Sequence, residues 1–367
     1  MTHPPVVLGL DFGGTKIAAA VCDLAGNKLA ATVVASHGEL GAQASFARGV
    51  AAGRELLRTA ADGAEPVAVG VSTFGIPFED RVELAPAISG WSTLPFGRDL
   101  RAAFPGSRIR MATDAKAAAQ AEARWGALAG CEPGVYLNLG TGLAAAIVSG
   151  GQVLNGRNGA AGEIGYSLRE HADVGLASGR RIPLEDMVSG LALQRRAAKA
   201  GRPLSTAEVF AASAADPDLD ELVTAFVREL AFHVTNLAIL VDPARIAVGG
   251  GMVRSWDRIR PVLADALSQA VPYPPELVLA QFPHDAPLLG AVALAVDEAG
   301  GQHPSTTDLN TVNSNGHKGT KSTMNASSRP QGDLPAGAPE ATSPSSACSN
   351  GTASPAAVDG QNSALKG

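Results

Sequence analysis

The sequence predicts an α/β fold built from two domains. Along residues 1–300, short apolar runs alternate with longer blocks of helical periodicity, a pattern typical of sheets covered by helices. The chain has 367 residues, of which 46% are hydrophobic and 17% charged, so a globular protein of about two domains is expected. Two similar strand-loop-strand segments, "GLDFGGTKIAAAV" and "LNLGTGLAAAIV", predict two domains of related plan that face each other.

The composition places the expected domain boundaries. We expect an N-terminal α/β domain over 1–113 and a C-terminal α/β domain over 114–300, whose last helix could pack back on the first domain. From about Gly301 the chain is rich in Ser, Thr, Asn, Gly, Pro and Ala and has no Phe, Trp or Tyr. Such a segment buries too little apolar surface to offset its ordering entropy, so 301–367 is predicted to be a disordered tail.

The elements of the ordered part follow from their periodicity. Helices are expected over 42–61, 115–128, 219–241 and 256–270, and in the third of these the apolar residues recur at spacings of three and four. Strands are expected at "VVLGL", "IAAAVCD", "PVAVGVS", "VYLNL", "AAAIVSG" and "RIAVGGG", and "KLAATVV" could follow the second as a further strand. The uncharged stretch 133–156 is interpreted as two buried strands around a tight loop rather than as a membrane span, because it contains polar residues and repeated glycines.

Charge and cysteine content exclude several classes of protein. The net charge is −6 and the basic residues are scattered, so neither nucleic acid nor a membrane surface is an expected partner. The N-terminus shows no signal pattern, so a cytoplasmic protein is expected. Cys22, Cys131 and Cys348 lie far apart without a CxxC pair, which supports neither a disulfide framework nor a cysteine zinc site.

The glycine-rich segment after the first strand predicts a phosphate-binding hairpin. A dinucleotide loop would lead into a helix and a Walker loop would end in GK[ST], whereas here Lys16 is followed by an apolar strand. The backbone N–H groups of Gly13 and Gly14 and the hydroxyl of Thr15 could face phosphate, and Asp11 could hold Mg²⁺ through water. The alternative is a plain hairpin turn whose glycines only supply unusual φ angles.

Two further glycine clusters support the phosphate interpretation. The second loop, Gly140, Thr141 and Gly142, repeats the strand-loop-strand pattern, and two such hairpins could hold a triphosphate from both sides. A third cluster, Gly249, Gly250 and Gly251, follows a strand and opens a helix, where a nucleotide ring could approach the backbone closely.

Seven segments follow one another in a characteristic order along residues 1–298. They are "GLDFGGTKIAAAV", "TDAKAAAQAE", "LNLGTGL", "GAAGEIGY", "PLEDMVSG", "VDPARIAVGGGM" and "APLLGAVALA". Together they resemble the ROK family of bacterial sugar kinases, which includes glucokinases and N-acetylmannosamine kinases. This resemblance implies an actin-like ATPase (ribonuclease H-like) fold, with ATP and sugar in an interdomain cleft, Mg²⁺ as a cofactor, and a homo-oligomer, dimer or tetramer.

The resemblance assigns roles to individual residues. Asp114 stands where these kinases have the base that takes a proton from the sugar hydroxyl, although its place before a helix also fits an N-cap. Glu163 and Glu185 match the family's sugar ligands, while Glu185 alone could be an ordinary first-turn acid. Lys16 is a minor candidate for a γ-phosphate contact.

The departures from the family lie on the sugar side. Thr113 replaces a usual Asn, Tyr166 replaces a usual His, and Ala87 replaces a frequent Asn; Thr113 and Tyr166 are kept as candidate sugar contacts. The family's His also binds a structural zinc with three cysteines, and the segment 167–186 contains no cysteine, so no zinc site is expected.

We therefore expect an ATP-dependent hexose kinase with glucose as the default substrate. The alternatives are a kinase for N-acetylmannosamine or N-acetylglucosamine, and a sugar-binding regulator that has lost catalysis. A DNA-binding repressor is not expected, because the first phosphate loop begins near Asp11 and leaves no room for an N-terminal helix-turn-helix.

Overall fold

The computed structural model describes residues 4–177, 179–283 and 285–301. The tail predicted for 301–367 lies outside the described residues except for Gly301, and so does Cys348.

The first sheet has five strands in the order β3-β2-β1-β4-β7. Strand β1 pairs antiparallel with β2 and parallel with β4, which in turn pairs parallel with β7. The predicted hairpin at the first glycine loop and the further strand after it are both present. The strands are Val6–Phe12 (β1), Lys16–Asp23 (β2), Lys28–Ala35 (β3), Ala68–Thr73 (β4) and Arg108–Thr113 (β7).

The second sheet has the same plan, in the order β10-β9-β8-β11-β12. Strands β8 and β9 form an antiparallel hairpin around the second glycine loop. Strand β11 pairs parallel with β8, and β12 pairs parallel with β11. The uncharged stretch 133–156 is thus mainly strand, as predicted. The strands are Gly134–Leu139 (β8), Leu143–Ser149 (β9), Gln152–Val153 (β10), Arg245–Gly249 (β11) and Glu276–Leu279 (β12); Ile76–Pro77 (β5) and Val82–Glu83 (β6) form a small separate ladder.

All four predicted helices are present; the fourth has the predicted bounds, and the ends of the other three differ. The second stops at Trp125 instead of 128, before Gly126, and the third begins at Pro217 because the side chain of Asp216 caps it and proline is tolerated in the first turn. The α-helices are Ala42–Ala60 (α1), Phe96–Ala103 (α2), Asp114–Trp125 (α3), Gly190–Lys199 (α4), Thr206–Ala212 (α5), Pro217–Val241 (α6), Trp256–Ala270 (α7) and Ala286–Ala299 (α8).

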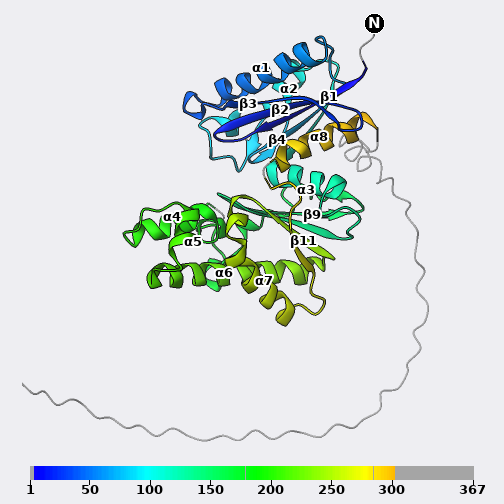
Figure 1. The fold of residues 1–367 in the computed structure, drawn as a ribbon. Helices are drawn as coiled ribbons and strands as arrows, with labels where there is room; N and C mark the ends of the chain where they lie inside the picture. Colours follow the sequence, from blue (N-terminus) through cyan, green and yellow to red (C-terminus); the bar gives the residue numbers. More distant parts are fainter. Residues whose placement is uncertain (1–3, 178, 284, 302–367) are drawn as a thin grey trace, which may run out of the picture. The chain divides into compact units, whose positions relative to one another are not determined.

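Helices cover both faces of the first sheet (Figure 1). Because side chains alternate along a strand, Leu8, Leu10 and Phe12 of β1 pack against α1 and α2. Val7 points to the opposite face, where Val292 of α8 packs against it. The glycines Gly9 and Gly70 occupy this second face and allow α8 to approach the strands at backbone distance.

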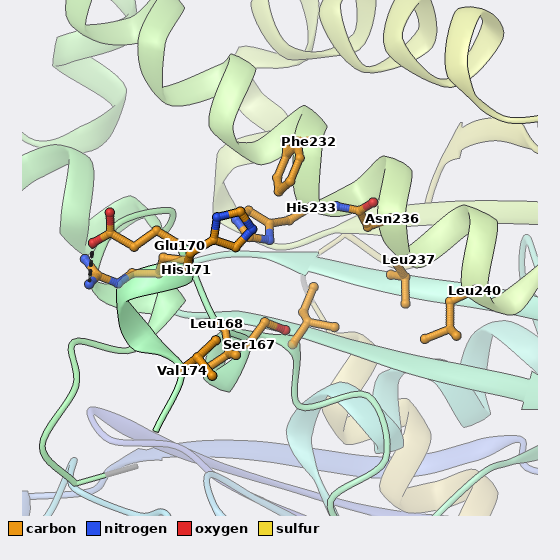
Figure 2. A pocket seen from close by; sticks show the side chains of 12 residues that line it. Ser167, Leu168, Glu170, His171, Val174, Phe232, His233, Asn236, Leu237 and Leu240 are labelled. Carbon is orange, nitrogen blue, oxygen red and sulfur yellow. Dashed lines mark hydrogen bonds and ion pairs between the residues drawn. The ribbon is translucent and has the colours of Figure 1, made fainter. Parts of the chain in front are cut away.

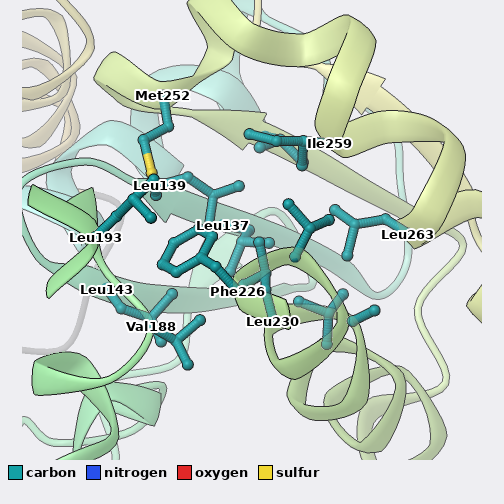
Figure 3. Close-up of a cluster of buried hydrophobic side chains, with 14 of the residues drawn as sticks. Leu137, Leu139, Leu143, Val188, Leu193, Phe226, Leu230, Met252, Ile259 and Leu263 are labelled. Atoms are coloured by element: carbon teal, nitrogen blue, oxygen red, sulfur yellow. The ribbon is translucent and has the colours of Figure 1, made fainter. Parts of the chain in front are cut away.

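The second sheet packs its hydrophobic core against helices α4 to α7 (Figure 3). Phe226 and Leu230 of α6 are fully buried beside Leu137 of β8. The same helix is the one described helix that is long and apolar enough to cross a membrane, and 56% of its most apolar window is buried in the protein. Its apolar character is therefore accounted for largely by this core.

Helices α3 and α8 cross in close contact. Gly290 of α8 lies against the backbone of Ala117, and a Cβ at this position would collide with the Ala117 carbonyl group. Helix α8 also packs on β1 and β4, so this crossing ties the first turn of α3 to the first sheet. The position of Asp114, the first residue of α3, depends on this packing.

We expect Gly290→Ala to lower the free energy of unfolding by about 1–3 kcal/mol, because the added methyl group forces the α3–α8 crossing apart. Urea denaturation followed by circular dichroism measures the change. Gly179→Ala is the control, since no atom lies within 4 Å of a Cβ there. Equal stability of the two variants would contradict the close-packing argument.

Candidate active site

Four polar residues meet at the carboxyl ends of parallel strands in the first sheet. Asp11 of β1 pairs with Ser72 of β4, and Thr73 pairs with Thr113 of β7. Adjacent parallel strands end at the same edge of a sheet, which is where α/β proteins bind their ligands. The hydroxyl of Ser72 donates a hydrogen bond of 2.8 Å to Oδ1 of Asp11 and orients this carboxylate.

Asp114 is the first residue of helix α3, and its side chain does not cap the helix. Thr113 is the N-cap, since its hydroxyl accepts a hydrogen bond of 3.3 Å from the N–H of Lys116. The N-cap interpretation of Asp114 was therefore wrong by one residue. Oδ1 of Asp114 accepts a 2.7 Å hydrogen bond from the N–H of Ala115. Burial raises the pKa of Asp114, and this hydrogen bond opposes the shift.

Asp11 has a pKa raised to about 7, chiefly because the carboxyl group is buried. The negative charge of Asp114 raises it further, while the Ser72 hydrogen bond and the attraction of Lys16 lower it. Two of the predicted residues, Asp11 and Asp114, are thus close enough for the charge of Asp114 to affect the ionisation of Asp11.

The first glycine loop is anchored through carbonyl oxygens. The hydroxyl of Ser36 donates to the carbonyl oxygen of Gly14 at 2.7 Å, and its N–H donates to that of Thr15 at 3.0 Å. Gly13 closes the hairpin by donating its N–H to the carbonyl oxygen of Lys16 at 2.9 Å. Gly14, Thr15 and Lys16 are exposed, so the loop tip is accessible to a ligand.

The second glycine loop lies between Glu185 and the start of helix α4. Oε2 of Glu185 accepts a 2.9 Å hydrogen bond from the N–H of Leu143, and a Cβ at Gly142 would collide with the same carboxylate. The carbonyl oxygen of Gly140 accepts a 2.9 Å hydrogen bond from the N–H of Gly190, and that of Thr141 accepts one of 3.2 Å from the next residue of the helix. Glu185 belongs to a short 3-10 helix, Leu184–Asp186, and not to α4, which begins at Gly190.

The third glycine cluster lies beside the second loop. Gly249 pairs with Asn138 of β8, and Gly250 has a φ of 89°, a left-handed conformation that favours glycine. A Cβ at Gly250 would come within 2.7 Å of Oδ1 of Asn138. Gly251 is exposed and begins the 3-10 helix that leads into α7. The second and third clusters are therefore neighbours, because Gly250 lies close to Asn138 and Leu139, which precede the second loop.

Glu163, Glu185 and Asp114 form a group of interacting carboxylates. Glu163 is half-buried, and burial raises its pKa to about 7, with smaller increases from the negative charges of Asp114 and Glu185. Tyr166 lies three residues on, at the end of a 3-10 helix, and its pKa is raised by burial and by the same two glutamates. The structure thus brings together the residues that the sequence predicted to contact the sugar.

Arginine side chains hold the loop that follows Tyr166. Arg181 donates to the carbonyl oxygens of Tyr166 and Ser167, the latter at 2.9 Å. Arg169 forms an ion pair of 2.9 Å with the buried Asp173, and its hydrogen bonds lower the pKa of that carboxyl to about 2. Among the described residues, no group of three or more His, Cys, Asp or Glu side chains could hold a metal ion.

Sequence reasoning missed these arginines and two other partners, Ser72 and Lys116. The spacing of Arg169 and Asp173 is a local signal that could have been recognised. Ser72 carries no such signal, because it meets Asp11 only through the pairing of β1 with β4.

A groove of about 590 Å³ lies beside this loop (Figure 2). Phe232, His233 and Leu240 of α6 line one side, and Leu168 and Val174 of the loop line the other. None of the predicted sugar or phosphate residues lines the groove. Polar side chains such as Glu170, His171 and Asn236 also line it, but none of the residues predicted to contact the sugar is among its lining residues, so we do not assign the sugar to it.

The architecture and the motif order match a known family. A family model described as the ROK family covers residues 7–298. The chain belongs to the ROK family. Its relatives include a kanosamine kinase from Amycolatopsis mediterranei, which is 32% identical over 318 residues, covering 82% of this chain and 99% of the relative.

Solved structures of ROK proteins have the same fold. A ROK hexokinase from Thermus thermophilus is 32% identical with a TM-score of 0.69, over 81% of this chain and 99% of that one. A ROK glucokinase from Streptomyces griseus, solved with glucose and AMPPNP, is 29% identical with a TM-score of 0.63, over 79% of this chain and 99% of that one. The predicted actin-like ATPase fold is confirmed by these two structures.

We expect Thr113→Ala to lower the free energy of unfolding of this ROK protein by about 1 kcal/mol, because the helix that carries Asp114 loses its cap. Thr113→Asn should keep the stability, since asparagine caps at least as well. Thermal and urea unfolding measure both variants, with the exposed Thr59→Ala as the control. A larger loss for Thr113→Asn than for Thr113→Ala would contradict the capping role.

Proposed function

We propose that this ROK protein is an ATP-dependent kinase that transfers the γ-phosphate of ATP to a hydroxyl group of a hexose, with glucose as the default substrate. The observation that supports this most directly is the placement of Asp114. Its carboxylate is held by backbone N–H groups of the first turn of α3, among them the Ala115 N–H, and this fixes its position. Its raised pKa is suitable for a general base, because a stronger base takes a proton more readily.

The proposed reaction requires mainly positioning and electrostatics. Glu163 and Glu185 accept hydrogen bonds from sugar hydroxyls and hold the ring. Asp114 takes the proton from the attacking sugar hydroxyl, while the oxygen of that hydroxyl forms a bond to the γ-phosphorus. The bond between the γ-phosphorus and the bridging oxygen breaks, and ADP leaves with that electron pair. A wrong epimer would leave the buried carboxylates unpaired, which is costly.

The nucleotide would be held by the glycine clusters. The exposed tip of the first loop offers Thr15 and Lys16 to phosphate, and the surface formed by Gly140–Gly142 and Gly249–Gly251 approaches the rest of the nucleotide. The residues also fit Mg²⁺. Burial raises the pKa of the Asp11 carboxyl group to about 7, and a nearby cation would stabilise its charged form. Asp11 would hold the ion through water, and the ion would neutralise charge on the phosphates.

A hexose that carries an amino group is the second candidate. The negative charge of Asp114 raises the pKa values of Glu163 and Glu185, and a substrate ammonium beside them would relieve this repulsion. The relative named as a kanosamine kinase makes such a sugar a relevant test. N-acetylmannosamine and N-acetylglucosamine remain alternatives, as does a catalytically inactive sugar-binding regulator. The cytoplasmic location and the dimer or tetramer expected from the sequence also remain proposals.

The test of the function is formation of ADP from Mg²⁺-ATP with glucose, mannose, amino hexoses and N-acetylhexosamines. We expect one preferred sugar and a loss of about 10²- to 10⁴-fold in kcat for Asp114→Asn, the usual contribution of a positioned base. Asp257→Asn is the matched control, because Asp257 is an exposed acid in the first turn of α7.

A sugar that binds to the wild-type protein but turns over no faster than with Asp114→Asn would favour the inactive regulator. Equal activity of Asp114→Asn and wild type would overturn the role of Asp114 as the base.

We expect activity to persist after zinc chelation when Mg²⁺ is in excess. The loop that carries a zinc ion in related kinases is held here by Arg181 and by the Arg169–Asp173 ion pair. Incubation with a zinc-selective chelator followed by the kinase assay measures this. A loss of activity that only added Zn²⁺ restores would contradict it.

A further inference from the structure

Lys116 is a buried cation in the first turn of helix α3. Its side chain is 2% exposed, and it lies two residues after Asp114. Burial disfavours a charged ammonium, and a helix N-terminus repels positive charge. The position is thus unfavourable for a lysine on two counts, so helix stability does not explain the residue.

The side chain of Lys116 reaches from α3 to the turn that carries Glu163. Its Nζ donates a hydrogen bond to the carbonyl oxygen of Gly159. The turn, residues 155–163, is also attached to β9, because the N–H of Ala145 donates to the carbonyl oxygen of Gly162 at 2.9 Å. Gly159 has a φ of 74° and packs against Ile76. Lys116 therefore binds the backbone of the turn four residues before Glu163.

Lys116 also acts on the charge of Glu163. Its attraction lowers the pKa of Glu163, against the increase from burial and from the charges of Asp114 and Glu185. The negative charge of Glu163 in turn raises the pKa of Tyr166. Glu163 is thus close to several negative charges, and Lys116 is the cation that opposes them.

We propose that Lys116 is a positioning residue of the sugar site, which holds the 155–163 turn on helix α3 and places a positive charge near Glu163, the proposed acceptor for sugar hydroxyls. The sugar role of Glu163 rests on the proposed function, whereas the effect of Lys116 on Glu163 does not. An ionised glutamate accepts hydrogen bonds on both oxygens, whereas a protonated one loses part of this capacity.

The sign of the pH effect follows from the carboxyl group. Glu163 has a pKa of about 7, so sugar affinity should fall as the pH decreases through 7. Removing the positive charge of Lys116 should raise that pKa, by about one unit if Lys116 acts like other nearby opposite charges. The acidic limb of sugar binding then moves to higher pH. A one-unit rise from 7 reduces the ionised fraction at pH 7 roughly five-fold, and KM for the sugar should rise accordingly.

Two variants separate the charge from the hydrogen bond. Lys116→Met removes both, while Lys116→Gln removes the charge and retains a donor for the Gly159 carbonyl group. Both should raise the pKa of Glu163, but only Lys116→Met should also loosen the turn. KM for ATP should stay unchanged in each, because Lys116 does not contact the glycine clusters in the described structure. Lys199→Met, at an exposed lysine of α4, is the matched control.

The experiment is a pH titration of the Glu163 side chain by carbon-13 NMR, assigned by its loss in Glu163→Gln, with amide hydrogen exchange of the 155–163 turn. Neither measurement needs a sugar or ATP.

A higher Glu163 pKa in both variants, with faster exchange in Lys116→Met alone, supports the proposal. An unchanged Glu163 pKa in either folded variant overturns it. If wild type phosphorylates no sugar while the titration shifts as expected, the proposed function fails and the effect of Lys116 stands.

A variant that does not fold leaves the other to decide. If neither folds, the wild-type titration decides, because a Glu163 whose pKa equals that of an exposed glutamate would contradict the electrostatic environment that the proposal requires.

Discussion

The close approach of helices α3 and α8 is the constraint on which the site depends. Gly290 lets the two backbones touch, and Gly9 and Gly70 let α8 lie directly on the first sheet. Asp11 projects from the end of that sheet, and Asp114 begins α3. Because α8 packs against both β1 and α3, the two carboxylates come close enough for the charge of Asp114 to raise the pKa of Asp11. Protein interiors transmit small shifts, so this packing determines where the reactive groups lie.

Electrostatic repulsion is the second organising feature. A kinase of the proposed type needs carboxylates as base, sugar ligands and metal ligand, and gathering them in a half-buried place raises their pKa values. The protein opposes this with a hydrogen bond from Ser72 to Asp11, one from the Leu143 N–H to Glu185, and the positive charge of Lys116 near Glu163. Each partner comes from a different element, so the balance of charge depends on tertiary structure.

The loop after Tyr166 is held by arginine side chains, in a segment, 167–186, that contains no cysteine. Their guanidinium groups bind backbone carbonyls and a buried aspartate. Glu185 follows this loop in the chain, and its carboxylate accepts a hydrogen bond from the N–H of Leu143, directly after the second glycine loop. The segment that carries Glu185 and the second glycine loop are therefore linked through one carboxylate, which explains why no bulkier residue than glycine fits at Gly142.

Much of this could be predicted from the sequence by itself. Hydrophobic periodicity located the four helices and the strands of both hairpins, because burial of one face is a local property of the pattern. The glycine clusters, Asp114, Glu163 and Glu185 stood out through motif order.

What the sequence could not decide was which side chains meet. Thr113 rather than Asp114 caps α3, since capping depends on the backbone angles of the helix start. Ser72 reaches Asp11 through strand register, and Lys116 reaches Gly159 across 43 residues of chain. Such contacts arise only when the sheets and helices pack, because sequence separation carries no information about distance in space.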